Sequence, residues 1–153
     1  MSDLSTGSAS VVVHRPPVDV WAVLADVTRM GEWSPECVAC RWVGDATGPA
    51  VGASFEGDNV AKVGGRVMKR WTTTSLVTAC EPGAVFEFVA EGYTTWRYEF
   101  TAEGDGTRVT ERFSYVPKGF QGFMYDTVLR RRSMMTKGMQ ATLERAKAAI
   151  EAS

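Results

Sequence analysis

Six runs of alternating apolar and polar residues, followed by one long amphipathic segment, constrain the fold more than any other feature of this sequence. The runs lie between Val38 and Val116, and turn-forming residues such as Gly64-Gly65 and Pro82-Gly83 separate them. Alternation with a period of two predicts strands, and connections this short predict antiparallel hairpins. The predicted strands span residues 38–44, 53–59, 69–80, 84–91, 94–103 and 107–116.

The segments on either side of this sheet complete the predicted architecture. Ser8–Arg15 is β-branched and predicts a first strand, while Pro17–Val27 and a stretch around 30–35 predict two short helices. Residues 120–152 predict one long helix with an apolar stripe at Val128, Met135, Met139, Leu143, Ala146 and Ile150. A one-sided apolar sheet has to bury that face, and this helix is the only element long enough to cover it. We therefore expect an α+β fold.

The length of 153 residues predicts one domain. We expect residues 1–8, which are rich in Ser and Gly, to be a flexible N-terminus, and residues 9–152 to form the domain. The N-terminus lacks the basic and apolar regions of a signal peptide, and no apolar run approaches the length of a membrane helix. These features predict a cytoplasmic protein with reduced thiols.

Composition argues against several classes of function. With 17 Lys and Arg against 18 Asp and Glu, the chain lacks the positive excess of nucleic-acid binders. A single His and three Cys exclude His-rich metal sites, so we expect neither a metal nor another cofactor. Beside this scarcity stand 7 Phe, 5 Trp, 4 Tyr and 7 Met. A small chain with few catalytic groups and many large apolar ones is more typical of a binding protein than of an enzyme.

The cysteines and the histidine are poor candidates for chemistry. Cys37 and Cys40 form a C-x-x-C motif, but the motif falls at a predicted strand, where residues three apart point to opposite faces. Cys80 is isolated in the sequence. His14 is expected to point to the solvated side of the first strand, because its valine neighbours face the core. We therefore expect no redox or zinc site and no catalytic role for His14.

Strand parity and helical spacing select a set of residues that face the space between sheet and helix. Large apolar side chains are normally buried, so most of them could simply fill the core. Core filling is the favoured interpretation for most of them. Gly122 and Gly138, which remove bulk from the helix, and the concentration of Met there point the other way, to an adaptable ligand-binding lining. The candidate ligand-binding residues are Phe55, Asn59, Trp71, Thr73, Ser75, Phe86, Phe88, Trp96, Tyr98, Phe113, Tyr115, Phe123, Met124, Met135 and Met139.

Glu111 is the one candidate catalytic residue. Its parity places a carboxyl group among Val109, Phe113 and Tyr115, where desolvation would raise its pKa and suit it to acid and base catalysis. The competing interpretation, which is favoured over catalysis because structural ion pairs also perturb carboxylates, is a carboxylate at the pocket rim, or one tied to a strand or to Lys and Arg from residues 60–70. The segment 59–66 could form a lid over such a pocket.

Four segments carry a resemblance to a known superfamily: Pro16–Glu36, Gly52–Asn59, Arg70–Val89 and Trp96–Phe113. They resemble the START/birch-pollen-allergen (SRPBCC) superfamily, in the branch called polyketide cyclase/dehydrase-like or lipid-transport-like. The resemblance covers about residues 9–150. It implies a helix-grip fold, in which a seven-stranded antiparallel sheet wraps around a long C-terminal helix, with two short helices after the first strand, around a hydrophobic tunnel. A fold-level resemblance does not determine the chemistry.

Three functions are compatible with these observations. The preferred hypothesis is binding or transport of a hydrophobic small molecule, lipid or polyketide-like, in the tunnel. The second is a cofactor-independent polyketide cyclase, aromatase or dehydratase that uses Glu111 as general acid and base. The third is a protein-interaction module of the toxin or co-chaperone kind. We expect a monomer or homodimer, without nucleic-acid partners and without stable membrane insertion.

Overall fold

A computed structural model describes the backbone of residues 5–115 and 121–152, and the side chains of residues 6–115 and 136–152. Its elements, in chain order, are β1 (Ser5–Val13), α1 (Pro17–Leu24), the 3-10 helix η1 (Val27–Glu32), β2 (Cys37–Val43), β3 (Ser54–Val63), β4 (Arg66–Glu81), β5 (Val85–Ala90), β6 (Thr94–Glu103), β7 (Gly106–Tyr115) and α2 (Gln121–Glu151). This order of one strand, two short helices, six strands and a long helix confirms the predicted α+β architecture.

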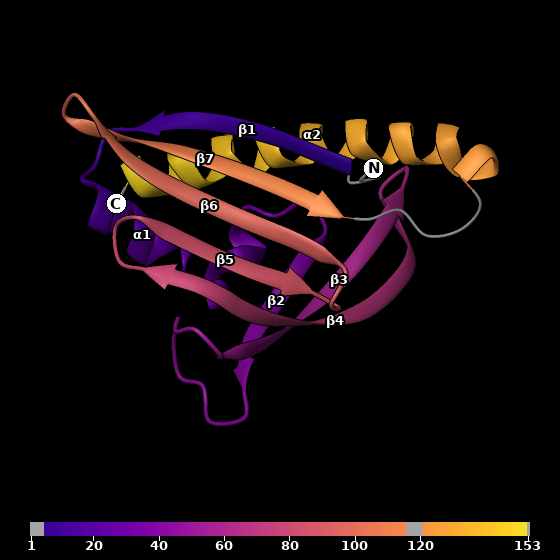
Figure 1. The fold of residues 1–153 in the computed structure, drawn as a ribbon, viewed down its shortest axis with the longest axis horizontal. Coiled ribbons are helices and arrows are strands. Elements are labelled where there is room, and N and C mark those ends of the chain that lie inside the picture. The colour runs from indigo at the N-terminus through magenta and orange to yellow at the C-terminus, as the bar shows by residue number, and fades with distance from the viewer. Residues whose placement is uncertain (1–4, 116–120, 153) are drawn as a thin grey trace.

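The strands form one antiparallel sheet in the order β1-β7-β6-β5-β4-β3-β2. Strands β2 to β7 follow one another as a meander, as the short turns predict. Because β1 and β2 lie at opposite edges, α1 and η1 carry the chain across the sheet between them. Figure 1 shows the curved sheet with α2 running along the β1–β7 side, which is the helix-grip arrangement.

Helix α2 packs along β1 because a glycine there leaves room for it. A Cβ atom on Gly7 would lie 2.6 Å from Oγ1 of Thr136, so a larger residue would push the helix away. Nearer the C-terminus, Nζ of Lys147 donates a hydrogen bond of 2.6 Å to the carbonyl oxygen of Val12. The described part of the predicted apolar stripe is confirmed by four buried side chains: Met139, Leu143, Ala146 and Ile150.

The short helix α1 packs against β6, β7 and α2. Pro17 occupies its first turn, where a missing amide hydrogen costs nothing. Trp21 is buried, and its indole Nε1 donates a hydrogen bond of 2.9 Å to the carbonyl oxygen of Val85 on β5. The next helix, η1, is capped by Asp26, whose side chain accepts from the amide of Thr28. The observed ends of α1 and η1 lie within about three residues of the predicted ends.

Strand boundaries differ from the sequence prediction at two places, the start of β1 and the β3–β4 hairpin. Strand β1 begins at Ser5, so residues 5–8 pair with β7 instead of preceding the sheet. Strands β3 and β4 continue to a turn at Gly64-Gly65, where both glycines have positive φ. The hairpin tip exposes apolar side chains such as Val63 and Met68, so the alternation that marks a half-buried strand is lost there. The segment 59–66 is therefore largely strand, and its role as a lid stays a prediction.

Candidate functional site

The sheet face that α2 covers, called here the inner face, is lined by two groups of aromatic rings. In the first, Phe55 contacts Trp42 and Phe88 edge to face, and Phe88 contacts Phe86. In the second, Phe113 packs against Trp96 and Tyr115, and the buried Met139 of α2 joins them. The ring centroids in these pairs are 5.0 to 5.9 Å apart, the range of ordinary aromatic packing.

The structure describes thirteen of the sixteen candidate site residues, and all thirteen lie on the inner face or on α2 against it. The buried ones are Phe55, Ser75, Phe86, Phe88, Tyr98, Glu111, Phe113, Tyr115 and Met139. The half-buried ones are Asn59, Trp71, Thr73 and Trp96. The remaining three, Phe123, Met124 and Met135, lie outside the described side chains. A role in ligand binding stays a prediction for the whole set.

Two polar residues on this face are already oriented by the protein. Nδ2 of Asn59 donates hydrogen bonds to the carbonyl oxygen of Gly57, at 3.1 Å, and to Oγ1 of Thr73, at 3.2 Å. Both side chains come from the β3–β4 hairpin and are half-buried. Their remaining hydrogen-bonding capacity could serve a polar group of a ligand.

Glu111 lies in the middle of the inner face. On β7 it is directly opposite Tyr98 of β6 on one side and Ala9 of β1 on the other. Only 4% of Glu111 is exposed, and its Oε1 has no hydrogen-bond partner among the described residues. The alternative ion pair of Glu111 with Lys or Arg of residues 60–70 is not among the salt bridges of the described residues, and such burial does not fit a rim position.

Burial controls the protonation of this carboxyl. Desolvation raises the pKa of Glu111 to about 8, against the smaller, opposite effect of hydrogen bonding with Tyr98. The pKa of Tyr98 is also raised, first by its burial and then by the charge of Glu111. A group with a pKa near 8 can hold or release a proton at neutral pH, which is the property that acid and base catalysis requires.

The prediction that Cys37 and Cys40 point to opposite faces is wrong. A β-bulge between Cys37 and Ala39 inserts an extra residue into β2, because Cys37 pairs with Asn59 and Ala39 with Asp58. The bulge turns both thiols to the inner face, where the two Sγ atoms are 3.1 Å apart. Alternation of apolar and polar residues carries no signal for an inserted residue of this kind.

His14 points outward, as predicted. Its side chain is 71% exposed, and Nδ1 lies 2.9 Å from Oε2 of Glu151 near the end of α2. This contact fastens the last turn of the helix to the segment after β1. It places the imidazole far from the aromatic inner face and gives it a structural partner.

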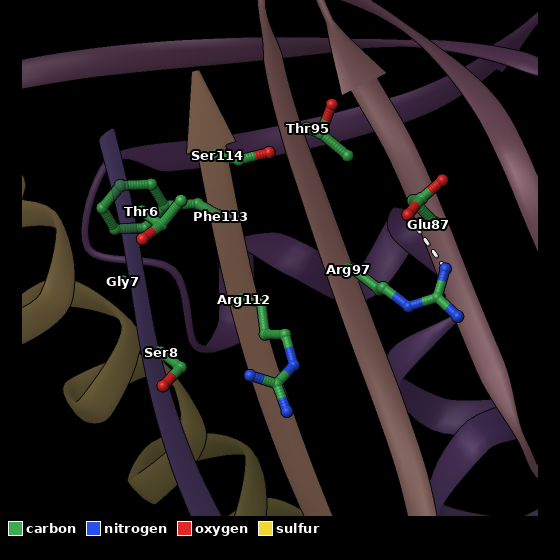
Figure 2. A pocket seen from close by; sticks show the side chains of 9 residues that line it. All are labelled: Thr6, Gly7, Ser8, Glu87, Thr95, Arg97, Arg112, Phe113 and Ser114. Carbon is green, nitrogen blue, oxygen red and sulfur yellow. Dashed lines mark hydrogen bonds and ion pairs between the residues drawn. The ribbon is translucent and has the colours of Figure 1, made fainter. Parts of the chain in front are cut away.

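The outer face of the sheet also carries a hollow, with a volume of about 420 Å³. Figure 2 shows its lining, which consists of Thr6, Gly7, Ser8, Glu87, Thr95, Arg97, Arg112, Phe113 and Ser114. Its charged groups are already paired: Arg97 bonds to Glu87 and Glu99, and Arg112 bonds to Glu99. The charged groups of the outer hollow therefore neutralise one another.

Comparison with known proteins decides the family. Residues 6–151 match the family model described as "Polyketide cyclase / dehydrase and lipid transport". The chain belongs to this family. The match spans nearly the whole sequence, so it includes the aromatic inner face, Glu111 and α2, and it places the chain in the START/birch-pollen-allergen superfamily that the sequence resembles.

Solved structures agree with the family. The Polyketide_cyc-like protein Cgl2372 of Corynebacterium glutamicum is 32% identical, with a TM-score of 0.70 over 99% of this chain and 94% of that one. The di-domain ARO/CYC StfQ of the steffimycin pathway is 17% identical, with a TM-score of 0.77 over 97% of this chain and 51% of that one. Ara h 8.0201 is 14% identical, with a TM-score of 0.66 over 98% and 99%. The last two likenesses show the shared fold alone.

No match to the sequence was found among curated proteins. In the part of the chain that the structure describes, no helix combines the length and the apolar character needed to cross a membrane. Membership of this family supports a hydrophobic small molecule as the partner, at the level of the family as a whole.

Proposed function

We propose that this protein binds an apolar small molecule between the inner face of the sheet and α2. The observation that carries the proposal is Oε1 of Glu111, which is buried among aromatic residues without a partner in the described part of the chain. A buried polar atom without a hydrogen bond is costly, and a ligand group that bonds to it would recover that cost. The family description, which includes lipid transport, supports the same conclusion.

The chemistry of the site defines the class of ligand. With a pKa of about 8, Glu111 is mostly protonated at pH 7, so an apolar ligand would meet a neutral carboxyl instead of a charge. A protonated carboxyl both donates and accepts hydrogen bonds. The proposed ligand is therefore an extended or ring-containing apolar molecule with a carbonyl or hydroxyl group that reaches Glu111. A lipid and a polyketide both meet this description.

A fluorescent apolar probe, N-phenyl-1-naphthylamine, tests the proposal. Its fluorescence rises when it leaves water, so a saturable rise on titration into the full chain measures binding. Thr73 lies on the inner face and its neighbour Thr74 is exposed on the outer face. The Thr73→Phe variant should bind the probe at least about tenfold more weakly, because the added ring fills the site. The matched variant Thr74→Phe should bind it like the wild type.

Two outcomes would contradict the proposal. One is a wild-type chain that shows no saturable binding. The other is equal loss of binding in Thr73→Phe and Thr74→Phe, which would place the probe elsewhere. Thermal melting of each variant checks that it folds. If Thr73→Phe does not fold, Trp96→Leu, which removes a ring from the inner face, should change the affinity for the probe, and Thr95→Leu on the outer face should leave it unchanged.

A cyclase or dehydratase activity is the second candidate function, and the pKa of Glu111 favours it. A carboxyl with a pKa of about 8 can take a proton from a carbon beside a carbonyl and return it to a leaving hydroxyl. The likeness to StfQ, an ARO/CYC protein, supports this chemistry by fold analogy. The test substrate is a soluble β-hydroxy ketone, whose dehydration gives a conjugated enone with its own absorbance. Glu111→Gln should then lose about a hundredfold or more in kcat while probe binding persists.

A further inference from the structure

The β-bulge in β2 brings two thiols together on the inner face. Cys37 and Cys40 are the first and last residues of a four-residue segment, and in a regular strand they would face opposite ways. With the extra residue, their Sγ atoms come within 3.1 Å of each other. A disulfide bond is about 2.05 Å long, so the two sulfurs need to approach by only about 1 Å more.

The surrounding residues leave room for both sulfurs. Gly57 lies opposite Cys40 on β3, and a Cβ atom there would be 3.1 Å from Sγ of Cys40 and 3.4 Å from Sγ of Cys37. A side chain at this position would press on the pair, so glycine keeps the space open. On the other side, Sδ of Met30 from η1 lies 3.8 Å from Sγ of Cys40. The two thiols thus share an enclosed, sulfur-lined position.

The two thiols differ in acidity because they are bonded to each other. The hydrogen bond with Cys40 lowers the pKa of the Cys37 thiol, and the same bond together with burial raises the pKa of the Cys40 thiol. The first proton therefore leaves from Cys37. The thiolate is the reactive form of cysteine, so Cys37 is the sulfur that reacts first with an oxidant. Burial raises the pKa of the third cysteine, Cys80.

We propose that Cys37 and Cys40 are a site of reversible oxidation, at which a peroxide converts the two thiols into an intramolecular disulfide. The proposal stands on the bulge, the separation of the sulfurs and the space left by Gly57. It does not depend on the identity of a ligand. The oxidant has to be small, because Cys37 is only 6% exposed.

The oxidation takes two steps. The thiolate of Cys37 attacks one oxygen of hydrogen peroxide, the O–O bond breaks, and the departing hydroxide takes up the proton that Cys37 lost and becomes water. Cys37 is then a sulfenic acid. The sulfur of Cys40 attacks the sulfur of Cys37, the S–O bond breaks, and the hydroxide leaves as a second water with the proton of Cys40. The two sulfurs together lose two electrons, and the peroxide gains them. A dithiol reductant reverses the reaction by thiol–disulfide exchange.

Hydrogen peroxide titration of the reduced, folded chain tests this site. After each addition the remaining thiols are alkylated with N-ethylmaleimide in denaturant, and the modified positions are mapped by peptide mass spectrometry. We expect two of the three thiols to disappear together, with the mass loss of two hydrogens in the peptide that contains Cys37 and Cys40. Cys80 should remain alkylatable, and dithiothreitol should restore all three.

Two variants serve as matched controls. Cys80→Ser should show the same paired loss as the wild type, since Cys80 takes no part. Cys40→Ser should form no disulfide and should accumulate the sulfenic acid of Cys37, which dimedone traps. Preferential oxidation of Cys80, disulfides between chains, or sulfinic acids at Cys37 without any internal disulfide would each overturn the proposal. The wild-type mapping decides the matter alone if a variant fails to fold.

Discussion

Tyr98 and Glu111 lie directly opposite each other on β6 and β7, in the middle of the face that α2 covers. Both side chains are at least 95% buried. The position is apolar enough to keep the carboxyl protonated near neutral pH, and hydrogen bonding with the phenol partly offsets this effect. This pair is the most specific chemical feature that the fold builds into its interior.

The raised pKa of Glu111 makes the stability of the protein depend on pH. In the unfolded chain the carboxyl titrates near 4.5, and in the folded chain near 8. Between these values the folded state binds more protons, so the free energy of unfolding should fall as pH rises from about 4.5 to about 8. The full loss is on the order of 5 kcal/mol. Urea denaturation of wild type and Glu111→Gln across this range measures it, and the variant should lack this decrease.

A neighbouring glutamate provides the control for that experiment. Glu99 is on the outer face of β6, where hydrogen bonds from Arg97 and Arg112 lower the pKa of its carboxyl. It is ionised in both folded and unfolded chains above pH 5, so Glu99→Gln should keep the slope of the wild type. A wild-type chain whose stability is constant from pH 5 to 8 would show that Glu111 is ionised in the fold.

Removing the Tyr98 hydroxyl should raise the pKa of Glu111 further. The hydrogen bond from the phenol favours the charged carboxylate, and Tyr98→Phe deletes it while keeping the ring. The carboxyl carbon of Glu111, followed by carbon-13 NMR during a pH titration, should change at a higher pH in the variant than in the wild type. A lower midpoint in Tyr98→Phe would mean that the phenol mainly stabilises the protonated form.

The contact between η1 and the bulge of β2 should tolerate no added bulk. A Cβ atom on Gly31 would lie 2.4 Å from the carbonyl oxygen of Val38, the bulged residue. Gly31→Ala should therefore lower the free energy of unfolding by about 1–3 kcal/mol. Gly48 has open space around it, and Gly48→Ala should change stability by less than about 1 kcal/mol. Equal stability of the two variants in urea would contradict this account of the bulge.

The end of α2 should loosen in acid. Oε2 of Glu151 accepts hydrogen bonds from Nζ of Lys147 and from the amide of His14, and these bonds lower the pKa of Glu151 to about 2. Its stabilising effect is therefore present at neutral pH and is lost as pH falls from about 4.5 towards 2. Glu151→Gln should melt at a lower temperature than wild type at pH 7, with a smaller difference in acid. Glu144→Gln, on the exposed side of the helix, is the matched control.

Much of this fold could be predicted because the sequence patterns that specify its strands and turns are local. Strands β5, β6 and β7 pair without a register shift, and short glycine or proline turns separate the strands, so the strand order and the face on which Glu111 lies could be predicted from parity. The same rule failed at Cys37 and Cys40, because a β-bulge shifts parity without leaving a mark in hydrophobicity. The same rule also predicted β3 and β4 to be shorter than they are. The tip of their hairpin is exposed on both faces, so apolar and polar residues do not alternate there.

The packing of the inner-face aromatic rings could not be predicted from the sequence. Parity shows that Trp96 and Phe113 share a face, but not whether their rings contact each other or leave space for a ligand. In the structure these rings are in contact. The proposed ligand binding therefore depends on how the inner rings and α2 would rearrange around a ligand, which is a property of packing and not of any pattern along the chain.

The indole signals of the five tryptophans give the most direct test of binding at the inner face. In nitrogen-15 NMR spectra, titration with N-phenyl-1-naphthylamine should shift the signals of Trp71 and Trp96, which are half-buried candidate site residues, with one saturation curve. The signal of Trp21, whose Nε1 is bonded to Val85, should stay in place. Unchanged Trp71 and Trp96 signals at saturation of the probe would contradict an interior ligand site.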